Sequence, residues 1–192
     1  MKEQQKKYEL TDEFIEHWSG KKLYRIRALV TFGAVVAGQL GGFIESEKNL
    51  DQSLSGDAWV YGDAEVSGDA RVYGNAWVYG DAEVYGDAEV YGDARVYGDA
   101  RVYGDARVRS HAVIFEHKMI FWASNVGSEN GTLTVFNGKD GLIVTRGCFT
   151  GTVDEFLAKS AEVHDDKTKN EYKLLIEVAK SRILEVKNET KF

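Results

Sequence analysis

The sequence has little cysteine, no long apolar run and no excess of basic over acidic residues, and each of these features excludes a class of protein. Cys148 is the single cysteine among 192 residues, which excludes a disulfide framework and favours a reducing intracellular compartment. The longest weakly apolar run, residues 28–37, is too short for a membrane span and follows two arginines, so neither a span nor a signal peptide is expected. A formal net charge of −7 argues against binding to duplex DNA or to an anionic membrane, because both need a basic surface.

What dominates the chain is a tandem repeat of six residues. From Ser55 to Val108, nine units of the form x-Gly-Asp-Ala-x-Val follow one another, with Ser67 and Asn75 as departures from the frame, and a degenerate tenth unit covers 109–114. Alternation places Ala and Val on one side and x and Tyr on the other, which is typical of a short half-buried strand. Gly-Asp then turns the chain. A six-residue period with Gly in every unit excludes a helix.

A short strand and a corner in every unit build a coil that closes after three units. Eighteen residues per coil predict a triangular prism with three parallel-sheet faces, and the narrow interior explains why Val and Ala alone fill it. With strands about 4.8 Å apart, nine units make three coils and roughly 14 Å of prism. Residues eighteen apart therefore stack in columns.

The repeat resembles the hexapeptide-repeat, left-handed parallel β-helix family, in which an aliphatic residue is followed four positions later by a small one. Val60 and Ala64 carry this pattern, which continues to Val102 and Ala106. The left-handed sense is implied by the resemblance. The flanks, at 24–28, 38–47, 131–134 and 145–152, resemble uncharacterised β-helix proteins of bacteriophages and prophages. That resemblance implies a phage origin, a homotrimer and the bacterial host cytoplasm, and brings no catalytic residue set.

One outward column is aromatic and predicts a subunit interface, with a ligand-stacking surface as the alternative. Its members and the tyrosines that flank it are Trp59, Trp77, Arg95, Tyr61, Tyr79 and Tyr97. The other two columns set Glu against Arg, as solvated faces do. Stacked turn aspartates suggest a cation, but exposed carboxylates are screened and each Asp has a local task in its turn, so no metal is expected.

The expected fold is mainly β, with three parts. Residues 1–33 form a β cap with a hairpin, residues 34–126 form the left-handed β-helix with regular hexads at 55–108, and residues 127–192 form a hairpin and a two-helix cap. Thr152 and Glu155 make a capping box for a helix that runs to about His164, and a second helix is expected from Glu171 to about Val186. The end modules cover strand edges that would otherwise polymerise.

An acyltransferase is one functional hypothesis, because hexapeptide β-helices include many such enzymes. They use a His general base at a subunit interface, with coenzyme A along the prism, and the candidates here are His111 and His117. No long loop interrupts the nine units to form a substrate pocket. The enzyme is therefore the weaker alternative, and neither a catalytic residue nor a cofactor is expected.

Candidate anion-binding residues lie in the flanks, because the repeat carries the whole net negative charge. The glycine-containing loop before the Thr152 helix leaves backbone N–H groups for an anion, and an arginine in it supplies a forked donor. Two further arginines share a strand face, and a tryptophan beside the last coil is suited to stack on a base. These residues are Arg146, Gly147, Thr150, Thr152, Arg25, Arg27 and Trp122.

Non-catalytic binding is the leading hypothesis. Its sharper form is a sponge that sequesters a small anionic, cyclic nucleotide used as a signal in bacterial antiphage defence. The alternatives are the acyltransferase and a structural part of a virion or a scaffold.

Overall fold

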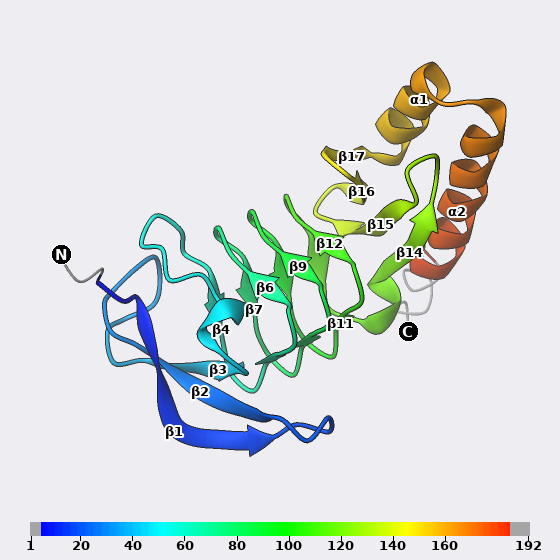
Figure 1. Cartoon of the computed structure of the whole chain (residues 1–192). Coiled ribbons are helices and arrows are strands. Elements are labelled where there is room, and N and C mark those ends of the chain that lie inside the picture. The colour runs from blue at the N-terminus through cyan, green and yellow to red at the C-terminus, as the bar shows by residue number, and fades with distance from the viewer. Residues whose placement is uncertain (1–4, 185–192) are drawn as a thin grey trace, which may run out of the picture.

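The chain coils into a β-solenoid because each hexad contributes one two-residue strand and one corner (Figure 1). The structure, a computed structural model, describes residues 5–184. The solenoid strands are β4 (Trp59–Val60), β5 (Glu65–Val66), β6 (Arg71–Val72), β7 (Trp77–Val78), β8 (Glu83–Val84), β9 (Glu89–Val90), β10 (Arg95–Val96), β11 (Arg101–Val102), β12 (Arg107–Val108) and β13 (Val113–Ile114).

The eighteen-residue register is confirmed. Trp59 lies opposite Trp77 and Val60 opposite Val78 in parallel pairing, and each later coil repeats this offset. The three faces are the sheets β3-β5-β8-β11, β4-β7-β10-β13 and β6-β9-β12. Every Ala and Val of the nine hexads is at most 1% exposed, so the predicted core is also confirmed. The left-handed sense of the coil stays a prediction.

Glycine is required at the corners for two reasons, as Gly86 shows. Its φ of 71° lies in the left-handed region, which L side chains rarely adopt. An added Cβ would also lie 3.0 Å from the backbone nitrogen of Gly104 in the next coil. The corners therefore stack closely because they carry no side chain.

One corner column replaces an aspartate with Asn75, and the structure gives the reason. The Asn75 amide nitrogen donates to Asp93 Oδ1 at 3.1 Å, and its oxygen accepts from the Asp57 backbone N–H at 3.2 Å. An amide between two carboxylates supplies a donor where a third carboxylate would repel its neighbours.

We expect Asn75→Asp to lower the melting temperature by about 2–4 °C at low ionic strength, and by less in high salt, because screening weakens the repulsion. Thermal melts followed by circular dichroism at two salt concentrations check this. Asp87→Asn is the matched control in an all-aspartate column, and it should not lower the melting temperature. An Asn75→Asp protein that melts like the native one at low salt would contradict the explanation.

The N-terminal cap extends one solenoid face. β1 (Tyr8–Glu16) and β2 (Lys22–Ala28) form the predicted antiparallel hairpin, and β3 (Leu40–Ile44) pairs antiparallel with β2 and parallel with β5. The hairpin, shown in blue in Figure 1, therefore belongs to the same six-stranded sheet as β5, β8 and β11. A short 3-10 helix, η1 (Glu47–Asn49), follows β3.

Side chains terminate the hydrogen-bond ladder at the N-terminal end of the solenoid. Lys7 Nζ donates to the carbonyls of Gly56 and Ala58 at 2.8 and 2.9 Å. Asn49 Nδ2 donates in the same way to Gly68 and Ala70 at 3.0 and 2.9 Å. In later coils, equivalent carbonyls accept from the backbone of the preceding coil. Each of these two side chains thus replaces two backbone donors.

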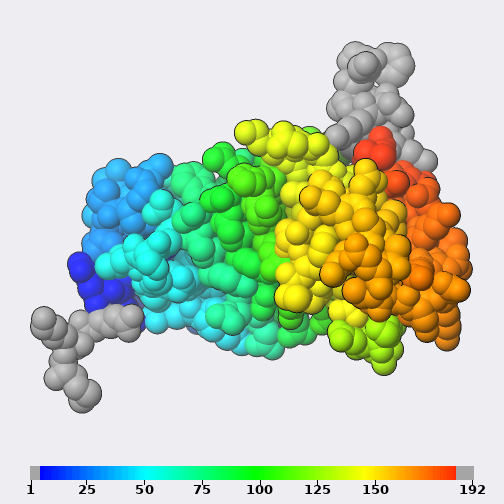
Figure 2. Space-filling view, turned by 90° about the horizontal axis from the view of Figure 1, so that it is seen from above, coloured from blue at the N-terminus to red at the C-terminus, as the bar shows by residue number. Residues whose placement is uncertain are grey.

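A second module closes the other end (Figure 2). Its four-stranded antiparallel sheet has the order β14 (Ile120–Val126), β15 (Gly131–Gly138), β16 (Gly141–Arg146) and β17 (Phe149–Thr152). α1 (Val153–Val163) and α2 (Asp166–Leu184) pack on the sheet around a second hydrophobic core. Polar side chains join it to the last coil, as when Thr145 Oγ1 donates to the Arg107 carbonyl at 2.8 Å.

Sequence patterns predicted part of this module. The hairpin β15–β16 and the Thr152 capping box are confirmed, whereas β14 and β17 were not expected. β14 lies inside the predicted 34–126 unit but pairs with β15. α2 begins at Asp166, not at Glu171, because Asp165 Oδ1 accepts from the Thr168 N–H at 2.8 Å and caps the first turn. The predicted end at Val186 lies outside the described residues.

Candidate functional site

Two hollows adjoin where the solenoid meets the C-terminal module. We call them together the junction groove. The first has a volume of about 500 Å³ and is lined by Asp81, Glu83, Asp99, Arg101, Glu116, His117 and Lys118. The second has a volume of about 470 Å³ and is lined by Arg101, Tyr103, His117, Lys118, Ile120, Phe121, Trp122 and Arg182.

Four separate elements supply the side chains of the second hollow. Arg101 and Tyr103 belong to the coil that contains β11, and Trp122 belongs to β14. Between them, the hexad pattern ends in a single 3-10 turn, η2 (His117–Met119), which buries Met119 and leaves His117 exposed. Arg182 comes from the last turn of α2. The groove therefore forms because the chain leaves the solenoid at η2 and α2 folds back beside it.

Aromatic rings form one wall of the second hollow. Tyr103 and Trp122 meet edge to face, with centroids 4.4 Å apart and ring planes at 85°. Tyr85 stacks on the other side of Tyr103 at 4.9 Å. An added Cβ at Gly104 would lie 3.0 Å from the Trp122 indole nitrogen, so this glycine lets the indole close on the coil. Tyr103 remains 40% exposed, which leaves a rigid aromatic edge facing the hollow.

The two hollows differ in charge. Arg101 is engaged by Glu83, with Nη2 and Nε 2.8 and 3.0 Å from Oε1. Within residues 5–184, Lys118 and Arg182 have no ion-pair partner, and no carboxylate lines the second hollow. This hollow is therefore a basic site on an acidic chain. Its cations and aromatic rings are suited to an anion that carries a planar ring.

The groove brings together two residues that the sequence assigned to different hypotheses. His117 was a candidate general base, and Trp122 was a candidate for stacking on a base; both line the second hollow. Tyr103, Lys118 and Arg182 were missed. Lys118 adjoins His117 in the sequence, but nothing in the pattern links Arg182 to a residue more than sixty positions away.

In the predicted anion site at the start of α1, the main donors are bonded within the chain, and binding of an anion there stays a prediction. Glu155 Oε2 accepts from the Thr152 N–H at 2.7 Å and from its hydroxyl at 3.1 Å, and these bonds hold the pKa of Glu155 below its usual range. Arg146 Nε donates to the Tyr172 hydroxyl at 3.1 Å, and its side chain is 12% exposed. The helix N-terminus and the guanidinium are thus engaged by the chain itself.

The other predicted residues of this loop separate into two smaller hollows. Thr150 and Thr152 line one of about 230 Å³ together with His111. Gly147 lines another, of about 170 Å³, together with Arg146. The loop therefore does not form a single anion cradle.

The two arginines of β2 are also paired within the chain. Arg25 Nε lies 2.7 Å from Glu13 Oε1, and its guanidinium lies 4.2 Å from the ring centroid of Phe43. Arg27 forms an ion pair with Glu9. The partner strand of the hairpin thus supplies a carboxylate to each of these arginines, and their role in binding a ligand stays a prediction.

The predicted interface column is partly covered by its own chain. Trp59 is fully buried, with Phe32 and Tyr8 packed edge-on at 5.4 and 6.1 Å. Trp59 therefore does not contact another subunit, and this part of the prediction is wrong. The remaining members, Trp77, Tyr61, Tyr79, Arg95 and Tyr97, are half-buried or exposed, and their place in an interface stays a prediction.

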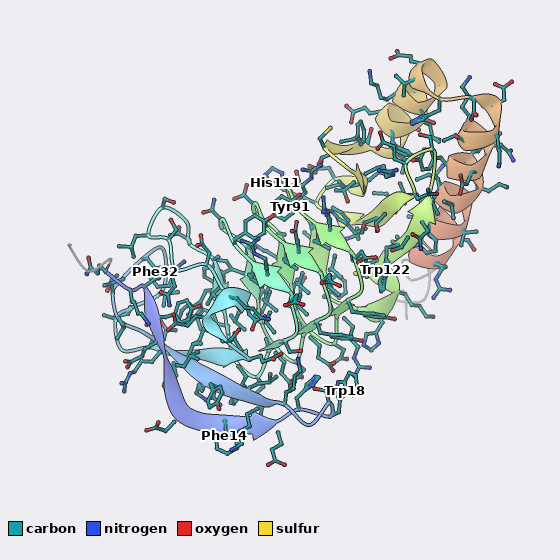
Figure 3. The ribbon with its side chains drawn as sticks, in the orientation of Figure 1. Phe14, Trp18, Phe32, Tyr91, His111 and Trp122 are labelled. Atoms are coloured by element: carbon teal, nitrogen blue, oxygen red, sulfur yellow. The ribbon has the colours of Figure 1, made fainter. Side chains whose placement is uncertain are left out.

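His111, the other candidate base, lies apart from the junction groove. Figure 3 shows it on another side of the last coil from Trp122. Its side chain is 67% exposed, and Nε2 lies 3.8 Å from Asp93 Oδ2 at the end of the Asn75 column. Within the described part of the chain, no group of His, Cys, Asp and Glu is arranged to hold a metal ion.

Comparisons with known proteins agree with the solenoid. The family model of the YdcK beta solenoid repeat matches residues 64–80, 88–102 and 94–114. All three segments lie within the coils, so the similarity concerns the repeat and not the flanking modules. No curated protein matches the chain. The chain is a β-solenoid repeat protein, and no helix among residues 5–184 is long and apolar enough to cross a membrane.

Proposed function

We propose that this chain is a non-catalytic binding protein whose junction groove takes a small anionic nucleotide. The observation that carries the proposal is the second hollow, where Lys118 and Arg182 face the Tyr103–Trp122 pair. Phosphate is bound by unpaired cations, and every nucleobase has a face or an edge that packs on aromatic rings. Although the chain carries a net charge of −7, its fold brings two basic side chains together in this hollow.

The same proposal covers the biological setting. The flanking segments resemble phage and prophage β-helix proteins, which supports a phage origin, a homotrimer of left-handed coils and residence in the bacterial cytoplasm. In that setting, a binding protein without turnover lowers the free concentration of its ligand. We therefore propose a sponge for a cyclic nucleotide signal of antiphage defence.

Ligand-induced stabilisation tests the binding. The native protein is melted with nucleoside monophosphates, cyclic mononucleotides and cyclic dinucleotides. A ligand at one hundred times its Kd adds about 2.7 kcal/mol, which is expected to raise the melting temperature by about 5 °C or more. Native mass spectrometry of the same samples reports the number of chains and of bound ligands. A melting temperature that no nucleotide shifts at millimolar concentration would contradict the proposal.

Charge-matched variants locate the site. Lys118→Ala with Arg182→Ala should weaken binding about 100-fold, because each lost charge-assisted contact costs roughly tenfold. Lys167→Ala with Lys173→Ala removes the same charge from exposed positions of α2 and should leave the Kd within about twofold. Equal weakening by both pairs would mean that the ligand senses only overall charge.

Acyl transfer is the second candidate, because His117 lines both hollows and is open to solvent. It predicts binding of coenzyme A and loss of turnover in His117→Ala. Binding of a nucleotide with no product formed from acetyl coenzyme A would favour the non-catalytic proposal.

A further inference from the structure

The two hollows of the junction groove share a wall. Arg101, His117 and Lys118 line both of them, so the hollows are two ends of one depression. The first hollow is the larger, at about 500 Å³. A nucleotide held by its phosphate in the basic hollow, with its base against the Tyr103–Trp122 pair, therefore has room for the far edge of that base to extend past this wall.

The first hollow offers hydrogen-bond acceptors. Within residues 5–184, Asp81, Asp99 and Glu116 have no ion-pair partner, whereas Glu83 is engaged by Arg101. Asp81 and Asp99 occupy equivalent corners one coil apart, about 4.8 Å along the solenoid. Glu116 comes from the turn before η2 and is half-buried. An ionised carboxylate accepts hydrogen bonds and donates none.

We infer that the nucleotide of the proposed function carries a guanine base. This inference rests on the proposed function and names the ligand class of the same groove. Guanine presents two adjacent N–H donors, N1–H and the N2 amine, which match a carboxylate in a bidentate pair. Adenine presents one exocyclic amine, and uracil sets a carbonyl on each side of its N3–H. Carbonyl oxygens facing these carboxylates would be repelled and left without donors.

Isothermal titration of the native protein with GMP, IMP, AMP and UMP tests the inference, because these probes carry the same phosphate. GMP should bind at least tenfold more tightly than UMP. IMP, which keeps N1–H but lacks the N2 amine, should fall between them. A site built to hydrogen-bond a pair of donors strongly rejects an analogue that lacks those donors. This discrimination is larger than that of an apolar pocket against a ligand of different size.

Two variants test whether the carboxylates of the first hollow cause the preference for guanine. Glu116→Gln and Asp99→Asn should each reduce the ratio of GMP affinity to UMP affinity several-fold, because the guanine loses a charged acceptor and the uracil carbonyls are no longer repelled. Asp87→Asn, which removes a corner carboxylate that does not line the groove, should leave the ratio as it is. A far-ultraviolet spectrum and a melt of each variant confirm folding.

The outcomes separate this inference from the proposed function. Equal affinity for all four nucleotides, or tighter binding of UMP than of GMP, would overturn the guanine preference and leave nucleotide binding in place. A preference that survives in both variants would place the recognition elsewhere and overturn the assignment to this hollow. Absence of binding by all four and by the cyclic nucleotides would refute the proposed function itself.

Discussion

Val90→Asp should unfold the solenoid or destabilise it by about 5 kcal/mol, because it places a carboxyl group where no polar partner exists. Val90 is fully buried and stacks between Val72 and Val108 in the adjacent coils. Solvation of the new side chain would require the prism to open. Urea unfolding followed by circular dichroism measures the loss.

Glu89→Gln is the matched control, since Glu89 precedes Val90 in the same strand and points outward. The Tyr73 hydroxyl donates to Glu89 Oε2 at 3.3 Å, and the amide oxygen of Gln accepts equally well. This control should change stability by less than about 0.5 kcal/mol. A Val90→Asp protein that unfolds cooperatively at the native urea midpoint would refute the inward orientation of the valine column.

Lys7→Met should destabilise the protein by about 3 kcal/mol, because two buried carbonyls lose the donor that Lys7 supplies. Lys7 is fully buried beside Phe32, and its ammonium bonds the carbonyls of Gly56 and Ala58. Lys6→Met is the control, because Lys6 is exposed and forms a surface ion pair with Glu47. An unchanged stability in Lys7→Met would show that the end of the ladder is solvated by water.

The same lysine predicts a pH dependence. Burial lowers the pKa of Lys7 from 10.5 to about 8, against the opposing effect of Asp51 and Asp57. Above pH 8 the unfolded chain therefore holds more protons on this amine than the folded chain, so stability rises with pH. Between pH 8 and 9.5 the free energy of unfolding should increase by up to about 2 kcal/mol. The increase should be absent in Lys7→Met; a flat native profile would contradict the shifted pKa.

Short-range patterns predicted most of the elements. The hexad encodes strand, corner and core together, so the register of Trp59 on Trp77 followed from a count of eighteen. The capping box of α1 could be predicted from the sequence because its two partners are three residues apart. The start of α2 was not, because polar residues 165–170 carry no apolar periodicity. The first turn of a helix needs a cap, which Asp165 supplies, but it does not need an apolar face.

The candidate site was predictable only in fragments. The sequence singled out His117 and Trp122 separately, but their meeting with Arg182 depends on α2 folding back beside η2. Contacts between distant segments also engage or cover other residues that the sequence offered as site candidates. Arg146 is held by Tyr172 from α2, and Trp59 is covered by Phe32 from the segment between β2 and β3. Each of these partners is distant in the sequence from the residue it contacts, and no sequence motif predicts the contact.

The sequence alone determined a three-sided coil with valine and alanine inside, because a strict repeat makes each residue's surroundings a copy of those one coil away. The tertiary structure decided which charged and aromatic side chains remain available for a ligand. That outcome depends on how the irregular ends fold back on the coil, and those ends have no period from which their contacts can be read.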